Sequence, residues 1–368
     1  MQAYATAKLV FDLHDFDVFF STADIGWITG HTYSCYGPLA NGASFVIYEG
    51  APDYPNCERI WQIIEKYGVT VFYTAPTLVR MLMMHGNDHV KSHKMESLIV
   101  LASVGEPIDK KAWMWFFEKV GKRRCPIIDT WWQTETGGTL INTLPGVGPF
   151  VPTVAGLPFP GTRWEVFDED GKPCKANVEG ELVGLPPFAP GMLRGVWRNE
   201  QRYVKTYWSR YPNAYLVEDR AFKSKEGLIR ITGRSDDVMK VAGHRLSTAE
   251  IESAIASHES VAECCVVPMR HAIKGEVPLA LVVLKHGAKP SERLKLEVIK
   301  QVERKISKIA RPSDVVFVSQ LPQTRSGKIM RRLIRRLLAR EALGDLSTLA
   351  NPESINEIKS VLKEKGYL

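Results

Sequence analysis

Short apolar runs alternate with amphipathic segments through about the first 235 residues of the chain. The runs VTVFYTAP (69–76) and SLIVLASVGEP (97–107) end in small or turn-forming residues, which is typical of buried strands. The segments CERIWQIIEKYG (57–68) and TLVRMLMMHG (77–86) have helical periodicity, and each closes on a glycine that is expected to end the helix. This order of strand and helix predicts an α/β fold with parallel sheets and functional residues at the strand ends.

A β-rich pattern follows in the segment TRWEVFDEDGKPCKANVEGELVGL (162–185). Two strand-like runs flank the turn sequence DEDGKP, as in an antiparallel pair. We therefore expect a meander or a small β-barrel-like part beside the parallel or mixed sheets of the large domain.

The pattern changes again near Gly233, where a polar, acidic segment precedes a new helix. Ser247 is predicted as the N-cap of this helix, and Glu250, three residues on, as its capping-box acid. The boundary between two domains is predicted near Asp236, which gives residues 1–235 and residues 236–368.

The second domain is predicted to be a small α+β domain. The runs VAECCVVPM (261–269) and VPLALVVLK (277–285) have the composition of strands. The segment LEVIKQVERKISKI (296–309) has the periodicity of an amphipathic helix.

The composition is that of a globular protein, with 45% hydrophobic and 24% charged residues among 368. No apolar run reaches the length of about 18 residues that a membrane span needs, and the N-terminus does not have the pattern of a secretory signal. The six cysteines contain no CxxC pair, which indicates reduced thiols in a cytoplasmic protein and neither a disulfide framework nor a zinc site.

The net charge of +7 is concentrated in one segment, RSGKIMRRLIRRLLAR (325–340), which contains no acidic residue. Its apolar residues recur at helical spacing, so the basic residues fit the solvated face of a helix. The same charge pattern also fits an anionic substrate such as ATP or CoA, or a nucleic acid. Charge alone leaves these three interpretations open.

Three segments have compositions that are unusual for structural turns. They are DTWWQTETGG (129–138), ITGRSDDVMKVAGHRL (231–246) and LPQTRSGKIMRR (321–332). The last one presents a lysine on a Ser-Gly turn directly before the basic helix.

With these motifs the chain resembles the adenylate-forming superfamily of acyl-CoA synthetases and, within it, the acetyl-CoA synthetases. The segments ADIGWITGHTYSCYGPLANGA (23–43) and SVGEP (103–107) match the same family, and the similarity extends from about Tyr4 to Leu349. The resemblance implies a ligase that joins acetate to ATP as acetyl-AMP and then transfers the acetyl group to coenzyme A. The basic helix is then the continuation of the lysine turn, so neither a nucleic acid nor a membrane is expected as a partner.

The resemblance implies roles for particular residues in adenylation. Lys328 corresponds to the adenylation lysine, although most lysines are simply solvated surface residues. Glu135 is expected to help hold Mg²⁺ on the phosphates, and Thr134 to donate to them. The adenine is expected against the loop Gly105, Glu106 and Pro107 and the turn Asp129, Thr130, Trp131, Trp132, Gln133 and Thr134. Asp219 and Arg234 correspond to the ribose-binding pair, and Arg245 to a phosphate contact or, on the residues alone, a structural ion pair.

Trp132 is expected to set the size of the acyl pocket. By resemblance its indole limits the substrate to acetate or propionate, whereas an ordinary core aromatic is the structural alternative. Ile28, Thr29 and Val104 would line the rest of the pocket, and Thr29 is also expected beside the cofactor. Because one methylene changes binding by only about 1–3 kcal/mol, propionate stays open as the substrate.

The family also implies a second conformation for the transfer to CoA. Its C-terminal domain is a mobile lid that turns about a hinge, here Asp236, and exchanges the Lys328 face for the face of Ala242 and Gly243. A further magnesium-binding loop maps to Ala256, His258 and Val261.

The sequence also departs from the family pattern. The Ser/Thr/Gly-rich phosphate-binding loop of the family precedes the region that matches here, and no GxxxxGK[ST] loop replaces it. We therefore expect a fragment or split subunit that works with a separate N-terminal synthetase piece, or alternatively an inactive remnant that binds nucleotide or other proteins. A smaller departure is Val217-Glu218-Asp219, where the family has Thr-Gly-Asp.

Overall fold

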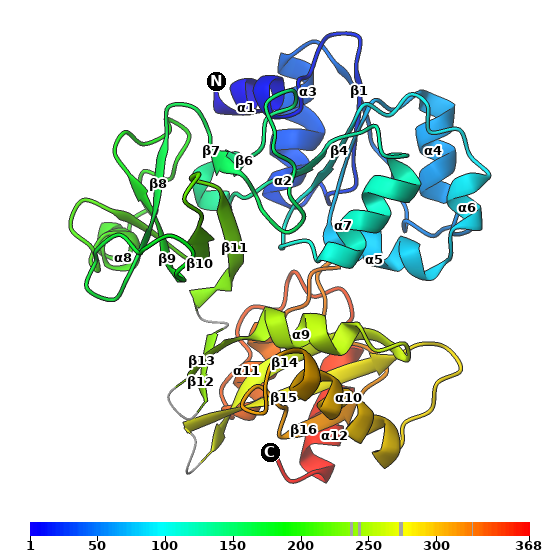
Figure 1. Cartoon of the computed structure of the whole chain (residues 1–368), viewed down its shortest axis with the longest axis vertical. Helices are drawn as coiled ribbons and strands as arrows, with labels where there is room; N and C mark the ends of the chain where they lie inside the picture. The colour runs from blue at the N-terminus through cyan, green and yellow to red at the C-terminus, as the bar shows by residue number, and fades with distance from the viewer. Residues whose placement is uncertain (236–237, 242–243, 272–274, 326) are drawn as a thin grey trace. The chain divides into compact units, whose positions relative to one another are not determined.

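The computed structural model describes residues 1–368 except 236–237, 242–243, 272–274 and 326, and for residues 238, 240, 244 and 245 it describes the backbone alone. The chain forms two compact units, Met1–Ile231 and Thr232–Leu368. The predicted hinge residue Asp236 lies outside the described residues. Each unit is built around its own sheets (Figure 1).

The first unit is centred on a parallel five-stranded sheet with the order β2-β1-β3-β4-β5. Its strands are β1 (Val18–Ser21), β2 (Ser44–Val46), β3 (Val71–Thr74), β4 (Val100–Ser103) and β5 (Ile127–Asp129). The strands predicted in 69–76 and 97–107 and the parallel sheet are thus confirmed.

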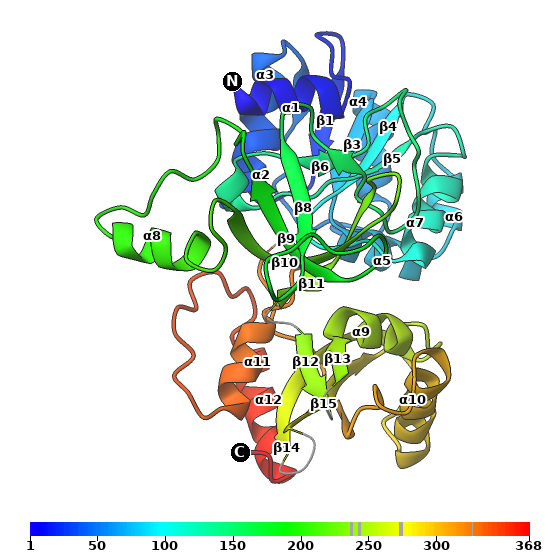
Figure 2. The same cartoon turned by 60° about the vertical axis from the view of Figure 1, so that its left-hand side comes forward.

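Helices cover both faces of this sheet, as Figures 1 and 2 show. These helices are α1 (Gln2–Val10), α2 (Ile28–His31), α3 (Gly37–Ala40), α4 (Arg59–Tyr67), α5 (Pro76–Met84), α6 (Asp88–Lys91) and α7 (Lys110–Trp115), together with the π-helical turns η1 (Thr32–Tyr36) and η2 (Phe116–Val120). The helix α8 (Glu200–Tyr207) lies instead against the antiparallel sheet that follows. Gly68 ends α4 in the left-handed conformation, as predicted. The helix α5 ends at Met84, and Gly86, which follows the C-cap His85, has a φ of +94°.

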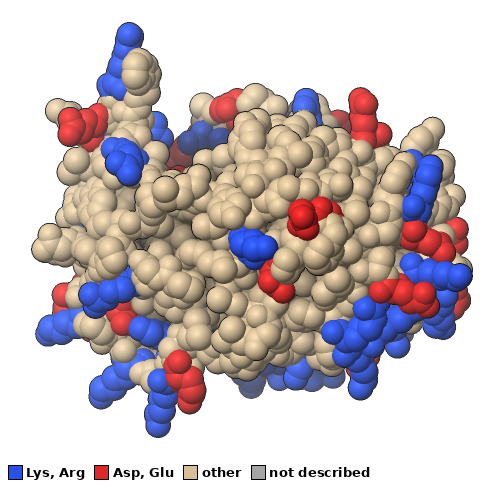
Figure 3. Space-filling model, turned by 90° about the horizontal axis from the view of Figure 1, so that it is seen from above, with Lys and Arg blue, Asp and Glu red and all other residues tan. Residues whose placement is uncertain are grey.

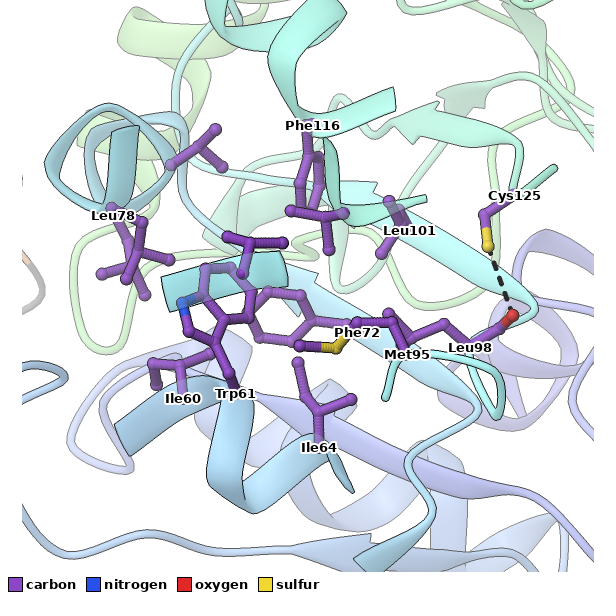
Figure 4. Close-up of a cluster of buried hydrophobic side chains, with 14 of the residues drawn as sticks. Ile60, Trp61, Ile64, Phe72, Leu78, Met95, Leu98, Leu101, Phe116 and Cys125 are labelled. Carbon is purple, nitrogen blue, oxygen red and sulfur yellow. Dashed lines mark hydrogen bonds between the residues drawn. The ribbon is translucent and has the colours of Figure 1, made fainter. Parts of the chain in front are cut away.

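Alternate residues of the strands enter two separate cores. Phe72 and Leu101 pack with Trp61, Ile64 and Phe116 on the face that α4, α5 and α7 cover (Figure 4). The residues in between, including Tyr73 and Ala102, pack on the opposite face with Phe11, which directly follows α1, and with Tyr33 of η1. Both faces of the sheet are therefore buried, which explains why its strands are apolar throughout.

An antiparallel sheet with the order β11-β10-β9-β8 follows. Its strands are β8 (Arg163–Phe167), β9 (Gly180–Leu185), β10 (Tyr215–Lys223) and β11 (Ile229–Arg234), and a small pair is formed by β6 (Ile141–Asn142) and β7 (Leu157–Pro158). The strands predicted on either side of the turn DEDGKP pair as β8 and β9, so this part is a meander.

The second unit contains a five-stranded sheet with the order β13-β12-β15-β14, in which β16 pairs in parallel with β15. Its elements are β12 (Val238–Val241), β13 (His244–Ser247), α9 (Thr248–Ala256), β14 (Val261–His271), β15 (Gly275–Leu284), α10 (Glu292–Lys305), β16 (Asp314–Phe317), α11 (Arg331–Leu338) and α12 (Glu353–Glu364). The predicted strands and helix of this α+β unit are present. Residues of α9 and α10 form one core with the sheet, and residues of α11 and α12 form a second core.

One local prediction was wrong. Ser247 occupies the N-cap of α9, but its side chain makes no capping hydrogen bond. Its hydroxyl instead donates to the Thr232 carbonyl over 3.2 Å. The capping box with Glu250 is therefore not formed.

Within the described part of the chain, the helices are all too short or too polar to cross a membrane.

Candidate functional site

The carboxyl ends of β3, β4 and β5 are joined by a chain of hydroxyl groups. The Thr130 hydroxyl donates to the Ser103 carbonyl over 2.7 Å and lies 2.8 Å from the hydroxyl of Tyr73. The Ser103 hydroxyl donates to Oδ1 of Asp129 over 2.7 Å. These bonds fix the loops that follow β4 and β5, which carry most of the predicted nucleotide-binding residues.

Asp129 is buried at the end of β5. Burial raises the pKa of its carboxyl group to about 7, although the hydrogen bond from Ser103 partly opposes this change. The Asp129 carboxyl group therefore has a structural role: its hydrogen bond with Ser103 links the ends of β4 and β5.

Gly105, in the loop after β4, has a positive φ and free space beside its Cα atom. Its φ of +94° is one that favours glycine, and a Cβ atom at this position would meet no other atom within 4 Å. The neighbouring Glu106 accepts hydrogen bonds from Thr77 and, over 2.6 Å, from Arg80. Glu106 thus anchors the loop to α5, while Gly105 and Pro107 are exposed.

Trp132 packs against an aromatic cluster on the α1 side of the sheet. Its ring packs edge-on against Tyr33 at a centroid distance of 5.1 Å, and its Nε1 donates to the Tyr73 hydroxyl over 3.3 Å. Val104 belongs to the same apolar cluster. Ile28 and Thr29 begin α2, which continues directly into the turn η1 that carries Tyr33. The structure thus brings Trp132 and Val104 together and places α2 next to η1.

The turn η3 (Thr134–Thr136) carries the predicted magnesium ligand. Gly137 ends this turn in the left-handed conformation, and a Cβ atom there would come within 2.4 Å of the Gly191 carbonyl oxygen. Thr134 is exposed, whereas Glu135 is half-buried. The Tyr207 hydroxyl donates to Oε1 of Glu135 over 2.9 Å, which orients the carboxylate from α8. Sequence reasoning missed Tyr207, because nothing in the motif indicates this distant partner.

Asp219 on β10 is buried and bound to the same motif. Its Oδ2 accepts hydrogen bonds from Trp131 Nε1 over 2.9 Å and from Gln133 Nε2 over 2.6 Å. Gln133 also donates to the Val217 carbonyl over 2.8 Å. Trp131 and Gln133 therefore hold the predicted ribose-binding acid, a role that the sequence analysis did not assign to them.

Glu218, next to Asp219, has a φ of 56° within an irregular part of β10. This is the left-handed region that favours glycine. The family glycine at this position therefore matches the backbone, and the glutamate of this chain occupies a strained conformation.

The second unit presents Lys328 on a tight turn. Thr324 N–H donates to the Lys328 carbonyl over 2.9 Å, and the Lys328 N–H donates to the Thr324 hydroxyl over 3.2 Å. The lysine side chain is exposed. The start of α11, directly after the turn, is fixed because Arg331 forms an ion pair with the buried Glu252 of α9.

The remaining predicted residues of this unit are only partly described. Arg234 is exposed at the end of β11, and Arg245 lies in β13 without a described side chain. Ala242 and Gly243 lie outside the described residues. Ala256 ends α9 and Val261 begins β14, while the His258 carbonyl between them accepts the N–H of Val261 over 3.1 Å.

Among the described residues, no group of three or more His, Cys, Asp or Glu side chains could hold a metal ion. These side chains alone therefore do not form a metal centre. Mg²⁺ in nucleotide sites is commonly held by one or two carboxylates together with phosphates and water. The single carboxylate of Glu135 fits a metal that is carried by the phosphates of a nucleotide.

Comparison with known proteins gives consistent results for both units. Residues 1–197 match the family described as AMP-binding enzyme, and residues 250–328 match the AMP-binding enzyme C-terminal domain. Acetyl-coenzyme A synthetase of Pyrobaculum aerophilum is 50% identical over 366 residues, which are 99% of this chain and 54% of that protein. Acetyl-coenzyme A synthetase of Gemmatimonas aurantiaca is 49% identical over 357 residues, which are 96% of this chain and 54% of that protein. The chain therefore spans about half the length of the curated relatives that it matches.

Solved structures with the same fold are also acyl-CoA ligases. The anthranilate CoA ligase AuaEII, in complex with anthranoyl-AMP, has a TM-score of 0.78 and 27% identity over 92% of this chain and 64% of that chain. A benzoate CoA ligase from Burkholderia xenovorans has a TM-score of 0.77 and 27% identity over 91% of this chain and 65% of that chain. Together with the match over residues 1–197, these similarities show that the chain belongs to the AMP-binding enzyme family.

Proposed function

We propose that this chain provides the catalytic lysine, the acyl pocket and part of the nucleotide site of an AMP-forming acetate–CoA ligase. In the first step a carboxylate oxygen of acetate attacks the α-phosphorus of ATP, which gives acetyl-AMP and pyrophosphate. In the second step the thiol of coenzyme A attacks the acetyl carbonyl, which gives acetyl-CoA and AMP. The identity of about 50% to acetyl-CoA synthetases across both units supports this proposal.

The geometry of Trp132 is the structural observation that carries the choice of substrate. The indole is fixed between the ring of Tyr33 and the hydroxyl of Tyr73, so it cannot easily turn aside for a long acyl chain. A pocket closed in this way favours two or three carbons. Propionate is the alternative substrate, because one methylene changes binding by only about 1–3 kcal/mol.

Adenylation brings a carboxylate towards the negatively charged phosphates, so it needs cationic groups. The exposed Lys328 would contact both the carboxylate and the α-phosphate. Glu135 would bind the Mg²⁺ of the nucleotide, with its orientation set by Tyr207. Asp219 and Arg234 would bind the ribose, and the Gly105–Pro107 loop the adenine. We place this reaction in the cytoplasm.

We further propose that the first unit docks the polypeptide segment that the curated relatives carry beyond the region matched here. Among the described residues of segment 1–54, ten large hydrophobic side chains are exposed: Met1, Tyr4, Leu9, Phe16, Ile25, Trp27, Tyr36, Leu39, Ile47 and Tyr54. Several belong to α1, α3 and their neighbours, and Figure 3 shows a broad face of the molecule with few charged side chains. In addition, β2 lies at the edge of its sheet. Exposed apolar faces and sheet edges of this kind are sites of protein association.

The test is acetyl-CoA formation from acetate, Mg-ATP and coenzyme A by the purified chain, with and without an N-terminal synthetase piece from an acetyl-CoA synthetase. We expect activity only with the piece. Activity of the chain alone would refute the need for a second segment. Absence of activity in both cases, with the chain folded and the piece bound, would refute the ligase proposal and leave a nucleotide-binding or interaction module.

Lys328→Ala separates the two steps in the complemented protein. We expect loss of acetyl-AMP formation by about a thousandfold or more, because a charge that stabilises the transition state is removed. The transfer of the acetyl group from supplied acetyl-AMP to coenzyme A should persist, because Lys328 has no role in that step. Loss of both steps together would contradict the assignment.

A further inference from the structure

A chain of titratable side chains lies outside the nucleotide and acyl site, next to the start of α4. The Sγ atom of Cys57 is 3.2 Å from Nε2 of His89, and Nδ1 of the same ring is 3.0 Å from Oε1 of Glu58. Cys57 and Glu58 directly precede α4, and His89 lies in α6. Thiol, imidazole and carboxylate thus follow one another at hydrogen-bonding distance.

The order of these groups determines where the protons lie. The carboxylate of Glu58 can only accept, so Nδ1 of His89 carries a proton. Nε2 then either accepts the proton of the Cys57 thiol or, once it has taken that proton, donates to the thiolate. The bond from His89 is the main cause that lowers the pKa of Glu58, which keeps this carboxylate ionised.

The other charged groups around this cluster have partners of their own. Nε2 of the mostly buried His93 is 3.8 Å from Glu58, and its Nδ1 is 2.7 Å from Glu65. Lys91 of α6 pairs with Asp88, and Arg59 of α4 lies over the ring of Tyr48. The start of α4 carries the positive end of a helix dipole, which favours a negative charge at Cys57.

The other cysteines have different surroundings. Cys125, Cys264 and Cys265 are buried. Burial raises the pKa of the Cys174 thiol, which reduces its thiolate fraction near neutral pH. Cys35 has the same intermediate exposure as Cys57 and is therefore the natural internal control.

We propose that Cys57 is a site of reversible S-thiolation by low-molecular-weight disulfides, activated by His89 and positioned by Glu58. His89 takes the proton of the thiol, and the Cys57 thiolate attacks one sulfur of the disulfide. The disulfide S–S bond breaks, a mixed disulfide forms on Cys57, and the departing thiolate takes the proton from Nε2 of His89. One disulfide and one protein thiol thus give one mixed disulfide and one small thiol, so the exchange is balanced. A further thiol reverses it.

The experiment uses oxidised glutathione on the full chain, with peptide mass mapping of each cysteine after acid quench. At pH 6.5 we expect Cys57 to react at least about fivefold faster than Cys35, because the imidazole of His89 lies 3.2 Å from the Cys57 sulfur and can take the proton of the thiol as it attacks. Between pH 8.0 and pH 6.5 the rate at Cys57 should fall less than the rate at Cys35, because His89, 3.2 Å from the Cys57 sulfur, can accept the thiol proton. Equal rates and equal pH profiles for the two thiols would refute the proposal without any variant.

Variants then identify the groups responsible. His89→Gln should give Cys57 the steeper pH profile of Cys35, and Glu58→Gln should move it in the same direction. His85→Gln changes an exposed histidine at the end of α5 and should leave both profiles unchanged. An unaltered profile in His89→Gln, with the tryptophan emission of the folded chain preserved, would overturn the role of His89. None of these outcomes depends on ligase activity.

Discussion

The buried carboxyl group of Asp129 gives a quantitative prediction about the stability of the first unit. Its pKa of about 7 in the folded chain lies well above the value of 3.8 for an exposed aspartate. The folded state therefore holds a proton that the unfolded state has lost between these two pH values. Stability from this group is fully present below pH 3.8 and is lost as the pH rises to about 7.

The magnitude follows from the size of the change in pKa. Each pKa unit corresponds to about 1.4 kcal/mol, so the full effect is on the order of 4 kcal/mol, and the part between pH 5 and pH 8 is about 3 kcal/mol. In Asp129→Asn the side chain keeps its shape but does not titrate. The free energy of unfolding of Asp129→Asn minus that of the wild type should therefore rise by about 3 kcal/mol between pH 5 and pH 8.

The assay is urea-induced unfolding followed by tryptophan fluorescence. All nine tryptophans lie between Trp27 and Trp208, so their emission reports the first unit alone. Asp170→Asn alters an exposed aspartate in the turn after β8 and should show a constant difference from the wild type. The other titrating groups contribute equally to the variant and the wild type, so they cancel in the difference between the two free energies of unfolding. If this difference for Asp129→Asn were constant or fell with rising pH, the reasoning would be refuted.

Three further substitutions test other parts of the chain. Glu252→Ala should destabilise the second unit by about 3–5 kcal/mol, because Arg331 loses its buried partner. The control Glu250→Ala changes an exposed residue and should cost less than about 0.5 kcal/mol. Hydrogen exchange of the β14 amides measures both effects, and equal protection of these amides in the two variants would contradict this expectation. Glu218→Gly should stabilise the first unit by up to about 1 kcal/mol in the fluorescence assay, because glycine adopts a positive φ without strain; a loss of stability would show that glutamate contacts outweigh the strain. Trp132→Gly in the complemented protein should shift the preference from acetate towards longer acyl chains in a carboxylate-competition assay, and an unchanged preference would remove the tryptophan from the pocket.

The parallel sheet and its helices could be predicted because the signals are local. The continuous apolar runs at 69–76 and 97–107 become strands whose alternate residues fill two separate cores. The failed capping box of α9 shows the limit of such reasoning. The hydroxyl of Ser247 binds the Thr232 carbonyl, 15 residues away in sequence, and no local pattern indicates that partner.

The candidate site shows the same division between local and distant signals. Glu135 and Lys328 are predicted as site residues from the short motifs that surround them. Tyr207 is not, because it reaches Glu135 from a polar helix 72 residues further along the chain. The unusual conformation of Glu218 is also absent from its own sequence context and is indicated only by the family glycine at this position.

The hydrogen bonds of the DTWWQTETGG motif also change how its residues should be interpreted. Family resemblance treats the segment Asp129–Thr134 as the surface against which adenine lies, yet Trp131 and Gln133 direct their side chains to Asp219, 88 and 86 residues away. A substitution of Trp131 should therefore act on the ribose-binding acid as well as on the adenine contact. Beside its predicted role as a ligand surface, the motif positions a carboxylate of another sheet, and this structural requirement explains why Trp131 and Gln133 occur where a simple strand cap would suffice.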